Sequence, residues 1–550
     1  MTFRNQLAET IFNQKYRHDG CETWEDLAKT LTLDVCSEYC SPDQVREITR
    51  IITEMKFIPG GRYLYYAGRI TKYFNNCYLL RSEEDSREDW AELSKKAELC
   101  LTSGGGIGND YSIYRGRGSI IHKTGGTASG PIDKMKMIDR IGKYVIQGGS
   151  RRSAIYASLN WQHKDIEEFL YVKDWHRNII PGTNGISQWD AKRNDPSFYA
   201  TLEGTNISVN YDTKWYMEFL RTGDVGSIFR RNVEQALKCG EPGFSFNFFD
   251  KEQETLRNAC TEVTSEDDSD VCNLGSINLS RIDNISDLAS TVELATLFLL
   301  CGTLVAQLPY DKIYTVREKN RRLGLGLMGV HEWLIQRNER YEVIPELHRW
   351  LQVYKGVSDH ASKYYAEKLS VSSPVANRAI APTGTIGILA GTTTGIEPVY
   401  AVAYKRRYFV ERERAKYQYN IDHAAQTIIQ ETGVSPETIE CSVDLANDYE
   451  RRIKFQADIQ DYVDMGISST INLPNSTNGN INVDDFASVL ARYSNRIRGF
   501  TCYPDGSRGG QPLVSVPYKE AINKLGQEFE EHTEVNDVCS IAGKGGVCGS

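Results

Sequence analysis

The sequence predicts an α/β protein with a substantially parallel sheet. From about residue 58 to 515, short apolar runs alternate with amphipathic helices and glycine-rich turns, and no clean linker interrupts the alternation. Residues 1–57 are instead predicted to be helical. Within them, Ser41 and Gln44 fit a reciprocal helix N-cap around Pro42.

Three segments are therefore expected: a helical segment at 1–57, an α/β unit at 58–515 and a flexible tail at 516–550. The tail carries a charged stretch from Gln527 to Glu534 and then becomes rich in glycine. It has few side chains that could form a core, which is typical of a mobile end.

Composition and charge exclude several classes of protein. The 550 residues carry a net charge of −9, so no basic field is available to neutralise nucleic-acid phosphates, and an anionic ligand must be bound locally. No uninterrupted apolar run reaches about 18 residues and the N-terminus lacks a signal profile, so a cytoplasmic protein without a membrane span is expected. In a reducing compartment the thirteen cysteines are available for catalysis, redox chemistry or burial rather than for structural disulfides.

One short motif combines an amide, a thiol and a carboxylate. Asn258, Cys260 and Glu262 alternate along the chain, so on an extended loop all three would lie on one face and could converge on a small ligand. Taken alone, the pattern also fits a buried cysteine beside a surface glutamate. The chain has no CxxC or HExxH zinc motif, and no histidine lies close to Cys260 in the sequence to activate its thiol.

Two glycine-rich segments could bind phosphate. Residues 381–386 combine small residues with hydroxyls, which suits an anion but also suits a plain tight turn. Residues 324–329 match GxGxxG, yet a charged run rather than a strand precedes them, so a dinucleotide site is not expected there.

Taken together, fourteen motifs between about residues 57 and 510 resemble the catalytic subunits of ribonucleotide reductases, most closely the adenosylcobalamin-dependent class. In chain order they are FIPGGR, NNCYLL, GGGIG, KTGGTASGP, QGGSRRSA, HKDIEEFL, NISV, EPGF, NACTE, CNLGSINL, RRLGLGLMG, APTGTIGILAGTTTGIEP, STINLP and FTCYPDGSR. The resemblance implies a ten-stranded α/β barrel of two parallel five-stranded halves, with a finger loop that carries a cysteine into its centre.

The resemblance also implies roles for the cysteines and their neighbours. Cys260 matches the thiyl radical that abstracts the 3′ hydrogen of the ribose. Glu262 matches the base that takes the 3′-hydroxyl proton, and Asn258 the amide that orients the sugar hydroxyls. Cys77 and Cys272 match the pair that reduces the 2′ position and closes to a disulfide, since loss of water from a 3′ radical needs an acid and two electrons close by.

Further residues match the binding regions of the family. The substrate would be held by Asn76, Pro382, Thr383, Gly384, Thr385 and Ile386, and Glu397 lies in the same motif without a role that the pattern assigns. Asp85, Arg115 and Arg151 match the regions that bind a deoxynucleotide specificity effector, a site that lies at a homodimer interface in the family.

The resemblance also predicts, from the two ends of the chain, how the active site is reduced again and whether dATP regulates the protein. Cys539 and Cys548 match the tail pair that shuttles electrons from a thioredoxin or glutaredoxin-type protein, although their spacing is wider than usual. The segment before FIPGGR is too short for an ATP cone, so overall control by dATP is not expected. Monomer or dimer, and diphosphate or triphosphate substrate, are left open.

One position separates the classes of the family. Oxygen-dependent reductases pass a radical from a separate metal subunit through two adjacent tyrosines, and here Tyr503 is followed by Pro504. The broken pair favours adenosylcobalamin as the cofactor. The alternatives are an oxygen-dependent subunit, a glycyl-radical enzyme, disfavoured by the cysteine and glutamate set, and an inactive nucleotide-binding paralogue, which should have lost that set.

Overall fold

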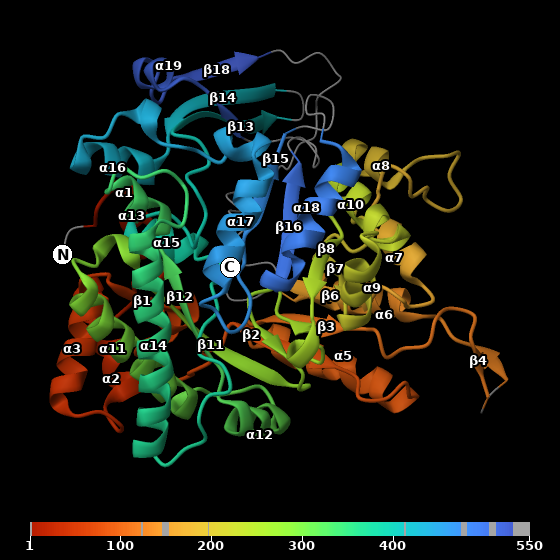
Figure 1. Cartoon of the computed structure of the whole chain (residues 1–550), viewed down its shortest axis with the longest axis horizontal. Coiled ribbons are helices and arrows are strands. Elements are labelled where there is room, and N and C mark those ends of the chain that lie inside the picture. The colour runs from red at the N-terminus through yellow and green to blue at the C-terminus, as the bar shows by residue number, and fades with distance from the viewer. Residues whose placement is uncertain are drawn as a thin grey trace.

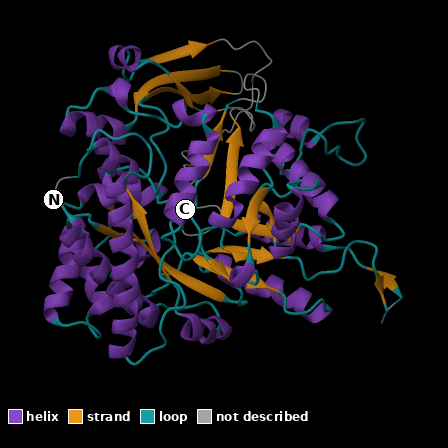
Figure 2. Ribbon diagram, in the orientation of Figure 1, coloured by secondary structure: helices purple, strands orange, loops and turns teal. Residues whose placement is uncertain are grey.

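The protein is an α/β fold with one ten-stranded mixed sheet, and helices lie around the strands (Figures 1 and 2). The structure is a computed structural model, which describes residues 3–122, 125–145, 153–195, 197–411, 414–474, 481–504 and 513–531. The α/β class expected from the sequence is confirmed.

Five neighbouring strands form the parallel half of the sheet. In spatial order they are β2 (Cys77–Arg81), β3 (Gly106–Asp110), β6 (Ile155–Asn160), β7 (Thr205–Tyr211) and β8 (Gly243–Phe246). The helices that follow these strands are α5 (Arg87–Thr102), α6 (Pro131–Tyr144), α7 (Ile166–Tyr171), α8 (Gln188–Asn194), α9 (Thr213–Thr222) and α10 (Ser227–Cys239). Parallel neighbours require such crossover connections, so the alternation in the sequence reflects this half directly.

The other strands form two parallel pairs, β11 (Asp270–Asn278) with β12 (Leu323–Met328) and β15 (Thr470–Leu473) with β16 (Gly499–Pro504). β11 runs antiparallel to β2, and β16 runs antiparallel to β8. β1 (Phe57–Pro59) pairs antiparallel with β11. The division into two five-stranded halves is therefore not confirmed. The GxGxxG segment expected to lack a dinucleotide site lies mostly within the buried strand β12.

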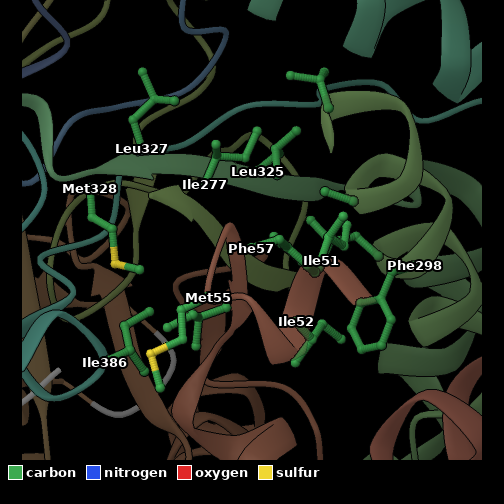
Figure 3. Packing of buried hydrophobic residues seen from close by; sticks show 14 of the residues in the cluster. Ile51, Ile52, Met55, Phe57, Ile277, Phe298, Leu325, Leu327, Met328 and Ile386 are labelled. Carbon is green, nitrogen blue, oxygen red and sulfur yellow. The ribbon is translucent and has the colours of Figure 1, made fainter. Parts of the chain in front are cut away.

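The N-terminal helices share a core with the sheet. They are α1 (Gln6–Lys15), α2 (Trp24–Cys36) and α3 (Pro42–Thr53), and the expected N-cap of Ser41 and Gln44 is present. Ile51 and Ile52 pack with Phe298 of α11 (Ile285–Val305) and Leu325 of β12 in one buried apolar cluster (Figure 3). The helical segment is thus part of the main fold.

α11 (Ile285–Val305) is long and apolar enough, by length and composition, to cross a membrane, with a mean hydropathy of 1.8. However, 72% of its apolar stretch is buried inside the protein, where the helix packs against α14 (Pro345–Lys368) and the N-terminal helices. A buried helix that is apolar on all sides is typical of the centre of a large core.

A second, four-stranded sheet lies at the top of Figure 1. Its strands are β13 (Ala403–Glu411), β14 (Arg414–Ile421), β17 (Leu513–Ser515) and β18 (Glu528–Glu531), with α19 (Tyr518–Asn523) beside them. The tail expected from residue 516 thus begins with an ordered helix and strand. Cys539, Cys548 and Arg151 lie outside the described residues.

The remaining elements connect these parts. The helices are α4 (Gly61–Tyr66), α12 (Asp311–Asn320), α13 (Val330–Ile335), α15 (Gly384–Ala390), α16 (His423–Thr432), α17 (Tyr449–Gln460) and α18 (Val483–Tyr493). Short hairpins are formed by β4 (Ile120–Ile121) with β5 (Gly126–Thr127) and by β9 (Leu256–Arg257) with β10 (Thr264–Ser265).

The β9–β10 hairpin, with its tip at residues 258–263, is called the finger below. It lies against β2 and β3 because glycine leaves room for its backbone. A Cβ atom built on Gly108 of β3 would overlap the carbonyl oxygen of Arg257, and one on Gly466 would lie 2.7 Å from the Thr261 oxygen. The finger therefore depends on the missing side chains at two distant positions.

Gly108→Ala is expected to destabilise the protein, because the finger backbone must shift to admit one methyl group. The expected loss in free energy of unfolding is about 1–3 kcal/mol, measured by urea denaturation. Gly356→Ala is the control: this glycine lies mid-helix in α14 with no atom near its would-be Cβ, and its substitution should stabilise by about 0.5–1 kcal/mol. Equal stability of Gly108→Ala and wild type would contradict the close packing of the finger.

Candidate active site

The finger tip is a tight turn rather than the extended segment expected from the sequence. The Thr261 backbone N–H donates to the Asn258 carbonyl oxygen at 3.0 Å, and Thr261 adopts a left-handed φ of 70°. The side-chain oxygen of Asn258 accepts from the backbone N–H of Val263 at 3.0 Å. Asn258 and Glu262 are therefore brought together by the closure of the turn, with Cys260 at its apex.

Cys77 lies directly beneath this turn, at the start of β2. The Asn258 side-chain amide lies 2.9 Å from the Cys77 sulfur, and that sulfur lies 3.9 Å from Oε1 of Glu262. All three side chains are buried. The structure thus brings together an amide, a thiol and a carboxylate that the sequence separates by about 180 residues.

Cys272 of β11 pairs in register with Cys77 across the antiparallel β2–β11 contact. Directly opposite residues project on the same face with Cβ atoms about 4.5–5.5 Å apart, whereas a disulfide holds them at about 3.5–4.5 Å. A small approach of the two strands would therefore allow the sulfurs to bond.

Burial controls the protonation of both thiols. It raises the pKa values of Cys77 and Cys272 well above the ordinary cysteine value, and the nearby Glu262 carboxylate adds to the rise for Cys77. Leu79, Val263 and Leu274 supply much of the apolar surrounding. Both cysteines therefore remain neutral thiols near neutral pH, able to donate protons.

Glu262 is set up to titrate near neutrality. Burial raises the pKa of its carboxyl to about 7, against the opposing effect of hydrogen bonds from Asn258 and Cys77. Its Oε2 atom is buried and has no hydrogen-bond partner within the described part of the chain. One carboxylate oxygen is thus available to a ligand proton.

Cys260 differs from the other two cysteines because it is only half-buried. Two glycines, Gly106 and Gly499, flank the finger tip. A Cβ atom on Gly106 would lie 3.2 Å from the Cβ of Ala259, and one on Gly499 would lie 4.0 Å from Thr261 Oγ1. The exposed Asn206, at the start of β7, donates to the Ala259 carbonyl oxygen at 3.3 Å. The apex thiol can therefore be approached from outside the finger.

The candidate phosphate segment is attached to the finger through Gly466. The Gly466 N–H donates to the Glu262 carbonyl oxygen at 2.6 Å, and its own carbonyl accepts from Ile380 at 3.2 Å. Pro382, Thr383 and Gly384 follow at once, and Thr383 has a left-handed φ of 52°. Its hydroxyl accepts from the Gly395 N–H at 2.7 Å. α15 begins at Gly384, and its next two residues, Thr385 and Ile386, are buried.

Asn76 precedes Cys77 and is half-buried. Its side-chain oxygen has no hydrogen-bond partner among the residues that the structure describes. A Cβ atom on Gly60 would lie 3.0 Å from the Asn76 amide nitrogen, so glycine admits this side chain. Asn76 thus keeps a free acceptor beside Cys77.

Asp85 and Arg115, two of the residues expected to bind an effector, contact each other. Asp85 Oδ2 accepts from the Arg115 backbone N–H at 3.1 Å and from its guanidinium. The two side chains are 29% and 37% exposed, so a ligand could reach both. The third, Arg151, lies outside the described residues.

Two supporting residues could not be recognised from the sequence. Arg452 is 2% exposed and donates to Glu397 at 2.9 Å, while the other Glu397 oxygen accepts from the Thr470 N–H at 3.0 Å. Glu397 therefore anchors the start of β15. Gly466, which holds the finger, lies in no motif, and only its contact with Glu262 reveals it.

A pair of buried neutral thiols beside a carboxylate and a more accessible third cysteine is typical of a thiol-based redox enzyme. A model of the ribonucleotide reductase barrel domain matches residues 75–362 and 375–503. The chain belongs to the ribonucleotide reductase family, which confirms the resemblance and the expectation that the protein is a ribonucleotide reductase.

Individual relatives agree with this assignment. The chain is 28% identical to the vitamin B12-dependent ribonucleoside-diphosphate reductase of Mycobacterium tuberculosis, over 87% of this chain and 74% of that protein. It is 28% identical to the enzyme of the same name from Thermoplasma acidophilum, over 86% of this chain and 66% of that protein. The class Id ribonucleotide reductase alpha subunit of Actinobacillus ureae superposes with a TM-score of 0.71 at 16% identity, covering 91% and 97% of the two chains, which shows a shared fold.

The raised pKa of Glu262 predicts a pH dependence of stability. The folded pKa of about 7 exceeds the unfolded one. The neutral carboxyl of Glu262 therefore makes its full contribution to the free energy of unfolding below the unfolded pKa, and this contribution is lost as pH rises through the folded pKa. Relative to Glu262→Gln, the wild-type free energy of unfolding should fall by roughly 3 kcal/mol between about pH 4 and pH 8.

Denaturation of both proteins across this range measures the effect. Glu266→Gln, which removes an exposed carboxylate four residues away, is the control. Parallel curves for wild type and Glu262→Gln would show that Glu262 ionises freely in the folded state, contrary to its burial.

Proposed function

We propose that the chain reduces ribonucleoside diphosphates or triphosphates to 2′-deoxyribonucleotides, with Cys260, Glu262, Asn258, Cys77 and Cys272 carrying the reaction. The observation that supports this most is the register of β2 and β11, which sets Cys77 opposite Cys272 beside Glu262. A reductive dehydration needs a proton donor, a base and two electrons at one place, and this group of side chains supplies all three.

In the proposed reaction, a thiyl radical on Cys260 takes the hydrogen atom from the 3′ carbon of the ribose. Glu262 accepts the 3′-hydroxyl proton through its unpaired oxygen, and a pKa near 7 leaves the base form available. One thiol of the Cys77–Cys272 pair protonates the leaving 2′-hydroxyl, which departs as water.

The two thiols then supply the two electrons and close to a disulfide, and the second thiol proton goes to the 2′ carbon. Glu262 returns its proton to the 3′ oxygen, and Cys260 returns its hydrogen atom to the 3′ carbon. One ribonucleotide and two thiols thus become one deoxyribonucleotide, one water and one disulfide. The side-chain amide of Asn258 positions the Cys77 sulfur and, in this proposal, also orients the sugar hydroxyls.

For the substrate, we propose that residues 382–386 hold the phosphates and that Asn76 binds near the sugar. The link through Gly466 supports this, because it ties the segment to the finger that carries Cys260. The accessible Asp85 and Arg115 pair is proposed as part of a deoxynucleotide effector site, for which Arg151 and a homodimer interface remain expectations from the resemblance.

We propose adenosylcobalamin as the cofactor, in line with the names of the two relatives. The chain fits this group in two respects: Cys260 is accessible at a finger tip flanked by Gly106 and Gly499, and β16 has Tyr503 followed by Pro504 instead of a second tyrosine. When bound, the cofactor supplies a radical by homolysis of its cobalt–carbon bond. The finger tip and Asn206 would contact it.

We also infer that the sheet, without β1, closes into a ten-stranded barrel. Its second half would consist of β11, β12, residues 378–380, β15 and β16. Single parallel bridges join Leu325 of β12 to Arg378 and Ile380 to Ile467, and β15 begins soon after Ile467. These bridges connect the two parallel pairs of that half. The finger would then lie inside the barrel.

Regeneration of the thiols is proposed to use Cys539 and Cys548, which would pass electrons from a thioredoxin or glutaredoxin-type protein to the Cys77–Cys272 disulfide. The support is their place in the sequence, close to the glycines that follow residue 542.

The purified chain is expected to reduce CDP or CTP anaerobically with dithiothreitol and adenosylcobalamin, without a second subunit. Cys260→Ala should reduce turnover to background yet keep nucleotide and cobalamin binding by calorimetry, because it removes one sulfur and no phosphate contact. Cys239→Ala, at a half-buried cysteine of α10, is the control and should retain activity.

Two outcomes would count against this proposal. Substantial turnover by Cys260→Ala would mean that another residue carries the radical. Activity that appears only with an added iron or manganese subunit would exclude the cobalamin assignment.

A further inference from the structure

A second group of cysteines, separate from the active site, lies among the helices on the other side of β11. The sulfur atoms of Cys36, Cys40 and Cys301 all lie within 4.8 Å of one another, and those of Cys40 and Cys301 are 3.7 Å apart. The reaction proposed above uses none of these residues. Three thiols converging at one point therefore need another explanation.

Local helical geometry sets two of the three thiols side by side. Cys36 is the last residue of α2, and the Cys40 N–H donates to the Cys36 carbonyl oxygen at 2.9 Å, which continues the helical pattern by one more turn. Residues four apart in such a turn lie on the same side. Cys301 completes the group from α11, against which α2 and α3 pack.

The spacing of the sulfurs suits a shared metal ion. With zinc–sulfur bonds of about 2.3 Å, two thiolates in a tetrahedral site lie about 3.8 Å apart, close to the Cys40–Cys301 separation. A disulfide would require about 2.05 Å. Three sulfur atoms that lie within 4.8 Å of one another, none of them at bonding distance, favour coordination over pairwise oxidation.

The surroundings suit a soft cation with one open position. Cys36 and Cys301 are buried, whereas Cys40 is half-buried and gives access from solvent. The ammonium of Lys368, at the end of α14, lies near enough to act on the charge of Cys40. Three thiolates, one divalent ion and one ammonium carry no net charge, so a site at this depth would not be left with an unbalanced charge.

We propose that Cys36, Cys40 and Cys301 bind one Zn²⁺ ion, with water as the fourth ligand. Thiolates select Zn²⁺ and other soft ions over Mg²⁺ or Ca²⁺, which prefer oxygen. The ion fastens α2 and the turn before α3 to α11. Bound there, the ion would stabilise the N-terminal helices against the core.

α11 connects this cysteine group to β11, the strand that carries Cys272. Gly302 follows Cys301, and a Cβ atom there would overlap the Tyr63 hydroxyl and lie 2.9 Å from the Asn273 amide. Asn273 is the neighbour of Cys272 and donates to the Tyr63 hydroxyl. Loosening α11 at Cys301 would therefore disturb the packing behind β11.

The test uses the full chain, freed of metal and kept reduced, then titrated with Zn²⁺ against a chromophoric chelator. Wild type is expected to bind one Zn²⁺ more per chain than the C36S/C40S/C301S variant, and its melting temperature should rise with Zn²⁺ while that of the variant does not. The control C21S/C100S/C441S changes three other buried cysteines and should keep the Zn²⁺. Equal Zn²⁺ binding by wild type and the C36S/C40S/C301S variant would overturn the proposal.

A second measurement does not depend on the folding of any variant. In wild type, Zn²⁺ should protect the accessible Cys40 from alkylation by iodoacetamide, and Co²⁺ should give thiolate-to-metal charge-transfer bands. Unchanged alkylation of Cys40 with Zn²⁺ present would overturn the proposal. Peptide mapping that finds a Cys40–Cys301 disulfide in place of bound metal would do the same and would make the group a redox pair.

Discussion

The antiparallel contact between β2 and β11 is the interaction on which the active site depends. It joins the five-stranded parallel half of the sheet to the strand pairs on the other side, and its register sets Cys77 opposite Cys272. A shift of one residue would turn one of the two thiols to the other face of the sheet. The finger then adds Glu262 and Asn258 from a third place in the chain. Strand pairing thus positions the reducing pair, and the turn positions the base.

Burial has one cost and three uses in this arrangement. Removing Glu262 from water disfavours its charged form and raises its pKa to about 7, which costs stability at neutral pH. The same burial keeps Cys77 and Cys272 as neutral thiols and gives the base a pKa suited to proton transfer. A buried site also keeps water away from a reactive radical. Apolar packing around the finger therefore serves the chemistry as well as the fold.

The sequence predicted the α/β class, the Ser41 N-cap and the family, since these rest on local patterns and on motifs in a fixed order. It could not show that Asn258 closes a turn around Val263, because an alternating polar pattern also fits an extended strand. The four-stranded sheet was missed for another reason: β13 and β14 pair with β17 and β18, which lie more than 100 residues later in the chain. Gly466 and the approach of Cys301 to Cys36 are equally products of long-range packing, which no single segment encodes.

The most direct test of the account is to map the cysteines after one turnover. The pre-reduced protein, without external reductant, is given adenosylcobalamin and CDP, quenched in acid, alkylated and digested for mass spectrometry. The account predicts that a Cys77–Cys272 disulfide forms in proportion to the dCDP produced, while Cys260 is recovered as a thiol. Product formation with Cys77 and Cys272 both still reduced, and no tail disulfide in their place, would contradict it.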